Sequence, residues 1–151
     1  MRIKADRGFS LIEVMLVLII LAGASFMLLL KWPAYQEKQQ LDTAATRLLS
    51  DLREVRQLAL GERVWYRVDF SPYDGIYRIY QGPGKSGKVV KIKEVHLPAG
   101  VEFANSDQGW DGLYFYPAGT PDKGRTYILA NTRGEVRKVI VAPVECRIRE
   151  E

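Results

Sequence analysis

The side chain with the clearest chemical demand is Glu13, a carboxylic acid inside an apolar stretch. Residues 9–30 contain this one Glu and no Asp, Lys or Arg. An ionisable group in such a place is costly unless a counter-charge neutralises it, and the stretch itself supplies none. Cleavage after Gly8 would create an α-amine about one helical turn from Glu13, which a neighbouring chain presents more readily than the same chain does. The alternative is a glutamate tolerated at a membrane interface.

The stretch that carries Glu13 is long enough to cross a membrane. As a helix, its 22 residues would span about 33 Å. Three basic residues precede it, which predicts a cytoplasmic N-terminus and an extracytoplasmic remainder. A cleaved secretory signal is the alternative, but the run is too long and ends in Lys31-Trp32-Pro33 rather than in small residues. We therefore expect a single-pass anchor over residues 9–30.

The residues around Glu13 form a known pattern. Gly8-Phe9-Ser10-Leu11-Ile12-Glu13 resembles the class III signal of type IV pilins and pseudopilins. The resemblance implies that residues 1–8 are a leader, which a prepilin peptidase removes by cleavage between Gly8 and Phe9 before it methylates the new Phe9 amine. It further implies that Glu13 pairs with the α-amine of an adjacent subunit. It also implies an inner-membrane location. The implied partners are lipid, an inner-membrane assembly platform and other pilin or pseudopilin subunits.

An amphipathic segment follows the apolar one. Its apolar residues recur at three- and four-residue steps opposite a charged face, which predicts that the helix continues over residues 31–61. Gly61 is expected to end the helix, and Pro33 to bend or open it. The predicted buried positions are Leu41, Ala44, Ala45, Leu48, Leu52, Val55 and Ala59. The predicted solvent-facing positions are Glu37, Lys38, Arg47, Asp51, Arg53, Glu54 and Arg56.

Residues 62–151 change to a period-two pattern that is typical of strands. The predicted strands are residues 64–70, 76–81, 89–97, 101–104, 113–116, 125–130 and 135–142. Turn residues between the first two and between the last two predict two hairpins. The predicted fold class is therefore α+β, with a long N-terminal helix packed on a small antiparallel β-sheet head domain.

The order of helix and strands, with the loops Leu97-Pro98-Ala99-Gly100-Val101 and Phe115-Tyr116-Pro117-Ala118-Gly119, is similar to the H-type minor pseudopilins of type II secretion and the T-type minor pilins of type IV pili. Gly134 and the basic tail Arg147-Ile148-Arg149 resemble the end of that domain. The resemblance implies a non-enzymatic, minor pseudopilin-like subunit of a type II secretion system or a related type IV filament. The alternatives are a minor pilin or competence pseudopilin that binds extracellular DNA, and an anchored domain unrelated to filaments.

Composition and the remaining motifs argue against other functions. One Cys and one His exclude a disulfide framework and most zinc or histidine chemistry, so we expect no metal and no cofactor. A net charge of +4 is small for a nucleic-acid binder. The P-loop-like residues 82–89 lack the hydroxyl residue and the following helix, and we interpret them as a hairpin loop.

The candidate residues for DNA or partner contact are Arg137, Lys138, Arg147 and Arg149, although interleaved glutamates favour a solvated surface of mixed sign.

Overall fold

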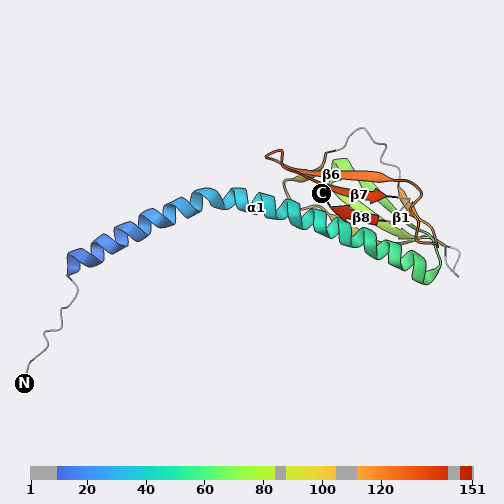
Figure 1. Cartoon of the computed structure of the whole chain (residues 1–151), viewed down its shortest axis with the longest axis horizontal. Helices are drawn as coiled ribbons and strands as arrows, with labels where there is room; N and C mark the ends of the chain where they lie inside the picture. Colours follow the sequence, from blue (N-terminus) through green and yellow to red (C-terminus); the bar gives the residue numbers. More distant parts are fainter. Residues whose placement is uncertain (1–9, 84–87, 105–111, 143–146, 151) are drawn as a thin grey trace, which may run out of the picture. The chain divides into compact units, whose positions relative to one another are not determined.

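The structure is a computed structural model that describes residues 10–83, 88–104, 112–142 and 147–150. Two compact units divide the chain, Met1–Gln36 and Glu37–Glu151. The described part of the first unit is helical, and the second unit contains the rest of that helix and the strands (Figure 1). The predicted α+β class, with a long N-terminal helix and antiparallel sheets, is confirmed.

Helix α1 spans Leu11–Glu62, and its backbone stays helical through Pro33, so the expected opening there does not interrupt it. The expected stop at Gly61 is wrong. The helix continues to Glu62, and Arg63 then takes a left-handed conformation with a φ of 56°. A non-glycine residue in that conformation costs about 1 kcal/mol. The packing of the next residue, Val64, against the hydrophobic core offsets this cost and fixes the turn.

The first sheet, sheet A, is built from an N-terminal hairpin and two added strands. β1 (Tyr66–Ser71) and β2 (Ile76–Gln81) pair antiparallel around the short 3₁₀ helix η1 (Pro72–Asp74), which confirms the first predicted hairpin. β3 (Val90–His96) pairs with β2, and β5 (Leu113–Phe115) pairs with β1. The resulting strand order is β3-β2-β1-β5.

The second sheet, sheet B, has the order β4-β6-β7-β8. β6 (Arg125–Asn131) and β7 (Val136–Ala142) form the second predicted hairpin, and β4 (Val101–Phe103) pairs with β6. β8 (Arg147–Glu150) pairs with β7, so the residues expected to be a basic tail form a strand instead. The physical reason is Ile148, which is 5% exposed and contributes to the core.

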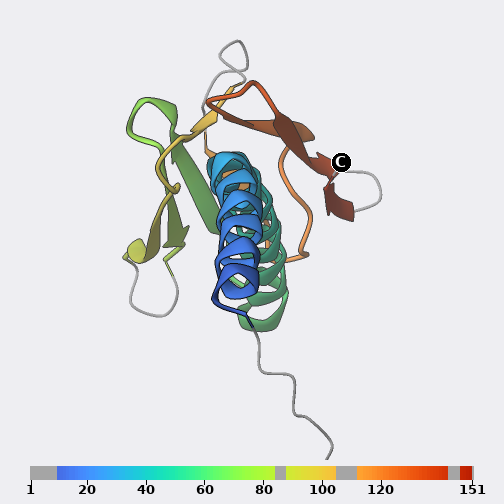
Figure 2. The same ribbon diagram turned by 90° about the vertical axis from the view of Figure 1, so that its left-hand side faces the viewer.

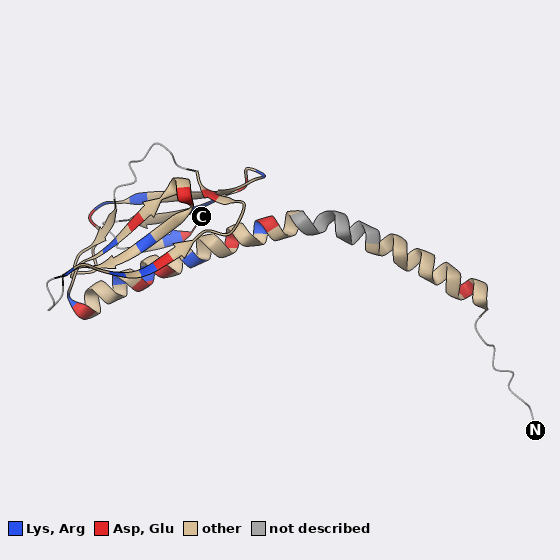
Figure 3. Ribbon diagram, turned by 180° about the vertical axis from the view of Figure 1, so that it is seen from behind, with Lys and Arg blue, Asp and Glu red and all other residues tan. Residues whose placement is uncertain are grey.

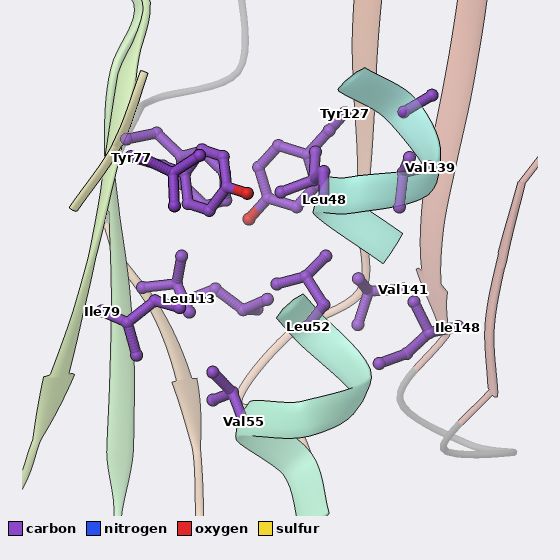
Figure 4. Packing of buried hydrophobic residues seen from close by; sticks show 14 of the residues in the cluster. Leu48, Leu52, Val55, Tyr77, Ile79, Leu113, Tyr127, Val139, Val141 and Ile148 are labelled. Atoms are coloured by element: carbon purple, nitrogen blue, oxygen red, sulfur yellow. The ribbon is translucent and has the colours of Figure 1, made fainter. Parts of the chain in front are cut away.

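The part of α1 from residue 37 to residue 62, which we call the head segment, packs between the two sheets (Figure 2). Its predicted apolar stripe is confirmed, because all seven positions from Leu41 to Ala59 are buried. Leu48, Leu52 and Val55 meet Ile79 and other side chains from both sheets (Figure 4). Burial of one such Leu or Val side chain stabilises a fold by about 1.5–3 kcal/mol, so this stripe holds the head together.

An aromatic cluster joins the two sheets beside the helix. Phe70 of β1 stacks on Tyr127 of β6, with ring centroids 4.2 Å apart, and meets the edge of Phe103 of β4 at 5.7 Å. Tyr77 of β2 lies 6.1 Å from Phe70. Offset stacked and edge-on pairs at such distances are the favoured arrangements of aromatic rings, so the cluster fixes how sheet A packs against sheet B.

Asp51 contradicts its predicted place on the solvent face of α1. It is 5% exposed, and both of its carboxylate oxygens are used. The Tyr77 hydroxyl donates a 2.6 Å hydrogen bond to Oδ2, and the Lys93 ammonium donates one of 2.6 Å to Oδ1. The helical period gave the wrong side because the cation that accompanies this carboxylate comes from β3, 42 residues away.

Candidate assembly site

The first turn of α1 places Glu13 at the start of the helix. The Ser10 carbonyl accepts hydrogen bonds from the backbone N–H groups of Glu13 (3.0 Å) and Val14 (3.2 Å), and so begins the helix. The carboxyl group of Glu13 therefore lies in the first turn, where the partial positive charge of the helix N-terminus favours an acidic side chain. Among the residues that the structure describes, Glu13 forms no ion pair.

The side chains around Glu13 are apolar and uncovered. In the part of α1 from residue 11 to residue 25, which we call the front segment, every side chain is exposed. Leu11 is 79% exposed, and even Val14 and Val17 are 48% exposed. Figure 3 shows this segment almost free of charge, whereas both signs are scattered over the head. Monomeric soluble proteins rarely expose an apolar surface of this extent, so lipid or another chain must complete it.

The polar groups of the front segment differ in how they are satisfied. The Ser25 hydroxyl donates a 2.8 Å hydrogen bond to the Leu21 carbonyl, which satisfies it within its own helix. Glu13 instead shares a shallow hollow with Val14, Val17 and Leu18, and no other residue that lines the hollow is polar. Unlike Ser25, Glu13 has no side-chain hydrogen bond or ion pair to any residue that the structure describes.

The processing residues Gly8 and Phe9 lie outside the described residues, so their roles stay predictions. Within the described chain, no helical segment combines the length and the apolar character needed to cross a bilayer.

A polar clamp fixes the point where α1 enters the head. Glu37 accepts hydrogen bonds from the Arg133 guanidinium (2.9 Å) and the Thr132 hydroxyl (3.0 Å) in the β6–β7 turn. One and a half turns further on, Asp42 pairs with Arg137 of β7 at 2.7 Å. The partners of this clamp lie some 95 residues apart, so no local sequence pattern could reveal it.

The structure separates the four basic residues proposed for DNA contact. On β7 the burial of Val139 places Arg137 on the inner face, where it pairs with Asp42, whereas Lys138 is exposed on the outer face. On β8 the burial of Ile148 places the positions of Arg147 and Arg149 on the outer face. The four do not form one patch, because Arg137 is engaged by the helix.

Charges on the outer face of sheet A are paired with one another. Hydrogen bonds from Arg78 and Lys91 lower the pKa of Glu94, and the bond to Glu94 raises the pKa of Arg78. Beside them, hydrogen bonds to Tyr114 and Asp69 raise the pKa of Arg67. The expected surface of mixed sign is therefore present on this sheet, and its cations are matched by nearby acids.

Other residue types that can bind metals do not form a second site in the described chain. His96 is exposed on β3, with its Nε2 3.6 Å from Glu94 Oε1. Residues 84–87 of the P-loop-like segment lie outside the described residues, as do Cys146, Asp107 and Asp111. No group of three or more potential metal ligands occurs within the described part.

Comparisons with known proteins bear on both the N-terminal motif and the fold of the chain. Residues 3–22 match the family described as the prokaryotic N-terminal methylation motif. No curated protein sequence matches the chain. The minor pseudopilin EpsH from the type II secretion system of Vibrio cholerae is similar in structure, with a TM-score of 0.61 at 13% identity over 74% of this chain and 96% of that chain.

The type IV minor pilin FimU of Pseudomonas aeruginosa is also similar, with a TM-score of 0.60 at 20% identity over 78% of this chain and 92% of that chain. At these identities the structural likeness establishes the fold. The chain therefore combines the N-terminal methylation motif with a pilin-like fold, and the predicted resemblance to type IV pilins and pseudopilins is confirmed.

Proposed function

We propose that this chain is a minor pseudopilin-like structural subunit, not an enzyme, of a type II secretion system or a related type IV filament. The observation that carries the proposal is the front segment: an uncovered apolar helix within the N-terminal methylation motif, with one carboxyl group in its first turn that pairs with no described residue. A filament supplies what this segment lacks, because neighbouring helices cover its apolar surface and a neighbouring terminus can reach Glu13.

In this proposal the chain is first a membrane protein. Residues 9–30 anchor it in the inner membrane, with the leader in the cytoplasm and the head outside. A prepilin peptidase removes residues 1–8 and methylates Phe9. The assembly platform then moves the subunit from lipid into a short filament, where Glu13 pairs with the α-amine of an adjacent subunit.

Processing is the most direct test of the motif. Gly8 lacks a Cβ, which allows the extended backbone to lie close to a protease cleft. When the chain is co-expressed with a prepilin peptidase, intact-mass spectrometry should find a product that begins at methylated Phe9. Gly8→Leu should keep the whole leader, while the control Ser25→Ala should be processed normally. Wild-type chain that still begins at Met1 beside an active peptidase would overturn the proposal.

Assembly tests Glu13 separately from processing. Glu13→Leu should insert in the membrane and lose its leader, but should enter sheared filaments poorly. Removing one member of a buried charge pair costs about 3–5 kcal/mol, far more than a change at Ser25, whose hydroxyl bonds its own helix. Filament content is measured by quantitative mass spectrometry, with Ser25→Ala as the control. Equal incorporation of Glu13→Leu and wild type would refute the pairing role.

A further inference from the structure

A pocket on the head has none of the roles assigned above. It lies between α1 and the end of β3 and has a volume of about 270 Å³. Ala44, Tyr77 and Val95 are buried apolar or aromatic residues on its lining. Thr43, Arg47 and His96 are exposed residues on the same lining, and we call the hollow the Arg47 pocket.

The charge of the Arg47 pocket is unbalanced. None of the residues that line it is acidic. Arg53 and Arg56, further along α1, donate hydrogen bonds to the carbonyls of Ile148 (2.9 Å) and Gly119 (3.2 Å). Arg47, in contrast, has no hydrogen bond or ion pair with any residue in the described ranges.

Nearby carboxylates are already occupied. Asp51 lies one helical turn beyond Arg47, but its two oxygens bind Tyr77 and Lys93. Glu94, the acid nearest to His96, accepts hydrogen bonds from Arg78 (2.8 Å) and Lys91 (3.1 Å). The pocket thus joins an apolar floor to a guanidinium that the described head does not neutralise.

The size of the pocket indicates what could fill it. Cofactor and drug-like sites commonly enclose about 300–1,000 Å³, and this pocket lies just below that range. A single aliphatic side chain fits such a hollow, and a carboxylate beside it would reach the guanidinium, which binds carboxylates with charge-assisted hydrogen bonds. The ligand that matches the Arg47 pocket is therefore an apolar side chain with a carboxylate next to it.

We propose that the Arg47 pocket receives an apolar side chain and its adjacent carboxylate from a neighbouring filament subunit. The identity of this partner rests on the proposed function, whereas the chemistry of the pocket does not. The apolar side chain lies on Ala44, Tyr77 and Val95, the carboxylate pairs with Arg47, and Thr43 and His96 offer further hydrogen-bond donors.

The chemistry is tested with the dipeptide acetyl-Leu-Glu-amide and its uncharged analogue acetyl-Leu-Gln-amide. Isotope-labelled full chain in detergent micelles is titrated with each and followed by NMR. The acidic peptide should produce saturable shifts at Thr43 and His96, and should bind about fivefold more tightly than the Gln analogue, the range expected of one partly exposed ion pair. Equal affinities, or no shifts at either residue, would overturn the proposal.

Two variants localise the effect. Arg47→Gln should remove the preference for the acidic dipeptide. The matched control Lys38→Gln removes the same charge from an exposed site on α1 outside the pocket and should keep the preference. Because both residues are exposed on the helix, neither change should disturb the core. A preference lost equally in both variants would mean general electrostatics and would overturn the site.

The partner class is tested in the membrane with a photo-crosslinking benzoylphenylalanine at Thr43. The expected adduct is a peptide from another chain that carries its own N-terminal methylation motif, with an acidic residue beside the captured apolar one. Adducts to lipid, or only to proteins without such a motif, would overturn the assignment of the partner. Failure here with normal cleavage after Gly8 would remove the docking site and leave the proposed function standing.

Discussion

The front and head segments of α1 belong to one helix, yet their apolar side chains differ in burial. In the head segment an apolar stripe is buried between two sheets, with Leu41, Leu48 and Ala59 each 0% exposed. In the front segment the apolar residues surround the helix, and the least covered, Leu11, is 79% exposed. The head segment is stabilised by its own chain, whereas the front segment requires other molecules.

The carboxylates of the two segments also differ in whether the chain itself supplies their partners. Asp51 in the head is paired by Tyr77 and Lys93 of the same chain. Glu13 in the front has no such partner in the described residues. A buried carboxylate without compensation is strongly destabilising, and the head satisfies Asp51 within its own chain. We propose that Glu13 finds its partner on assembly.

The largest expected contrast comes from one leucine in each segment. Leu52→Ala should lower the free energy of unfolding of the head by about 2–5 kcal/mol, because it opens a cavity between the sheets. Leu18→Ala, on the exposed front segment, should change it by less than about 0.5 kcal/mol. Both are measured by chemical denaturation of the full chain in micelles, followed by tryptophan fluorescence. Similar losses in the two variants would mean that the segments do not fold separately.

A smaller contrast separates two buried tyrosines. The Tyr77 hydroxyl donates to Asp51, whereas the Tyr127 hydroxyl has no hydrogen-bond partner in the described part of the chain. Tyr77→Phe leaves one carboxylate oxygen unsatisfied and should cost about 1–3 kcal/mol. Tyr127→Phe removes an unsatisfied group and should be neutral or slightly stabilising. The same denaturation experiment compares them, and a larger loss for Tyr127→Phe would contradict this account.

Sequence patterns predicted the elements well where a local period decides them. The stripe from Leu41 to Ala59 and both hairpins follow from periods that the sequence states directly. β8 was missed because a four-residue strand with one buried side chain, Ile148, has no period to detect. The end of α1 was misplaced because Arg63, rather than a glycine, takes the left-handed conformation.

The functional residues also differ in whether the sequence alone could reveal them. The motif that contains Gly8, Phe9 and Glu13 is contiguous, so the sequence alone could point to it. The clamp between Glu37 and Arg133, the burial of Asp51 and the Arg47 pocket depend on contacts between distant strands and the helix. Such contacts arise from the sheet order, which no local pattern determines.

The smallest predicted effect concerns Tyr66 at high pH, where the head should weaken while the front segment, which has no tyrosine, is unaffected. Burial and the hydrogen bond to Glu62 raise the pKa of Tyr66 from 10.0 to about 12. The folded state therefore holds this proton more tightly than the unfolded state, so its contribution is complete below pH 10 and is lost as the pH rises towards 12. At about pH 11 the loss from Tyr66 should be about 1 kcal/mol.

Denaturation of Tyr66→Phe should show a shallower fall in stability above pH 10 than wild type, whereas the control Tyr73→Phe, at a fully exposed position, should follow wild type. Identical slopes for Tyr66→Phe and wild type would mean that Tyr66 ionises as readily in the folded head as in the unfolded chain.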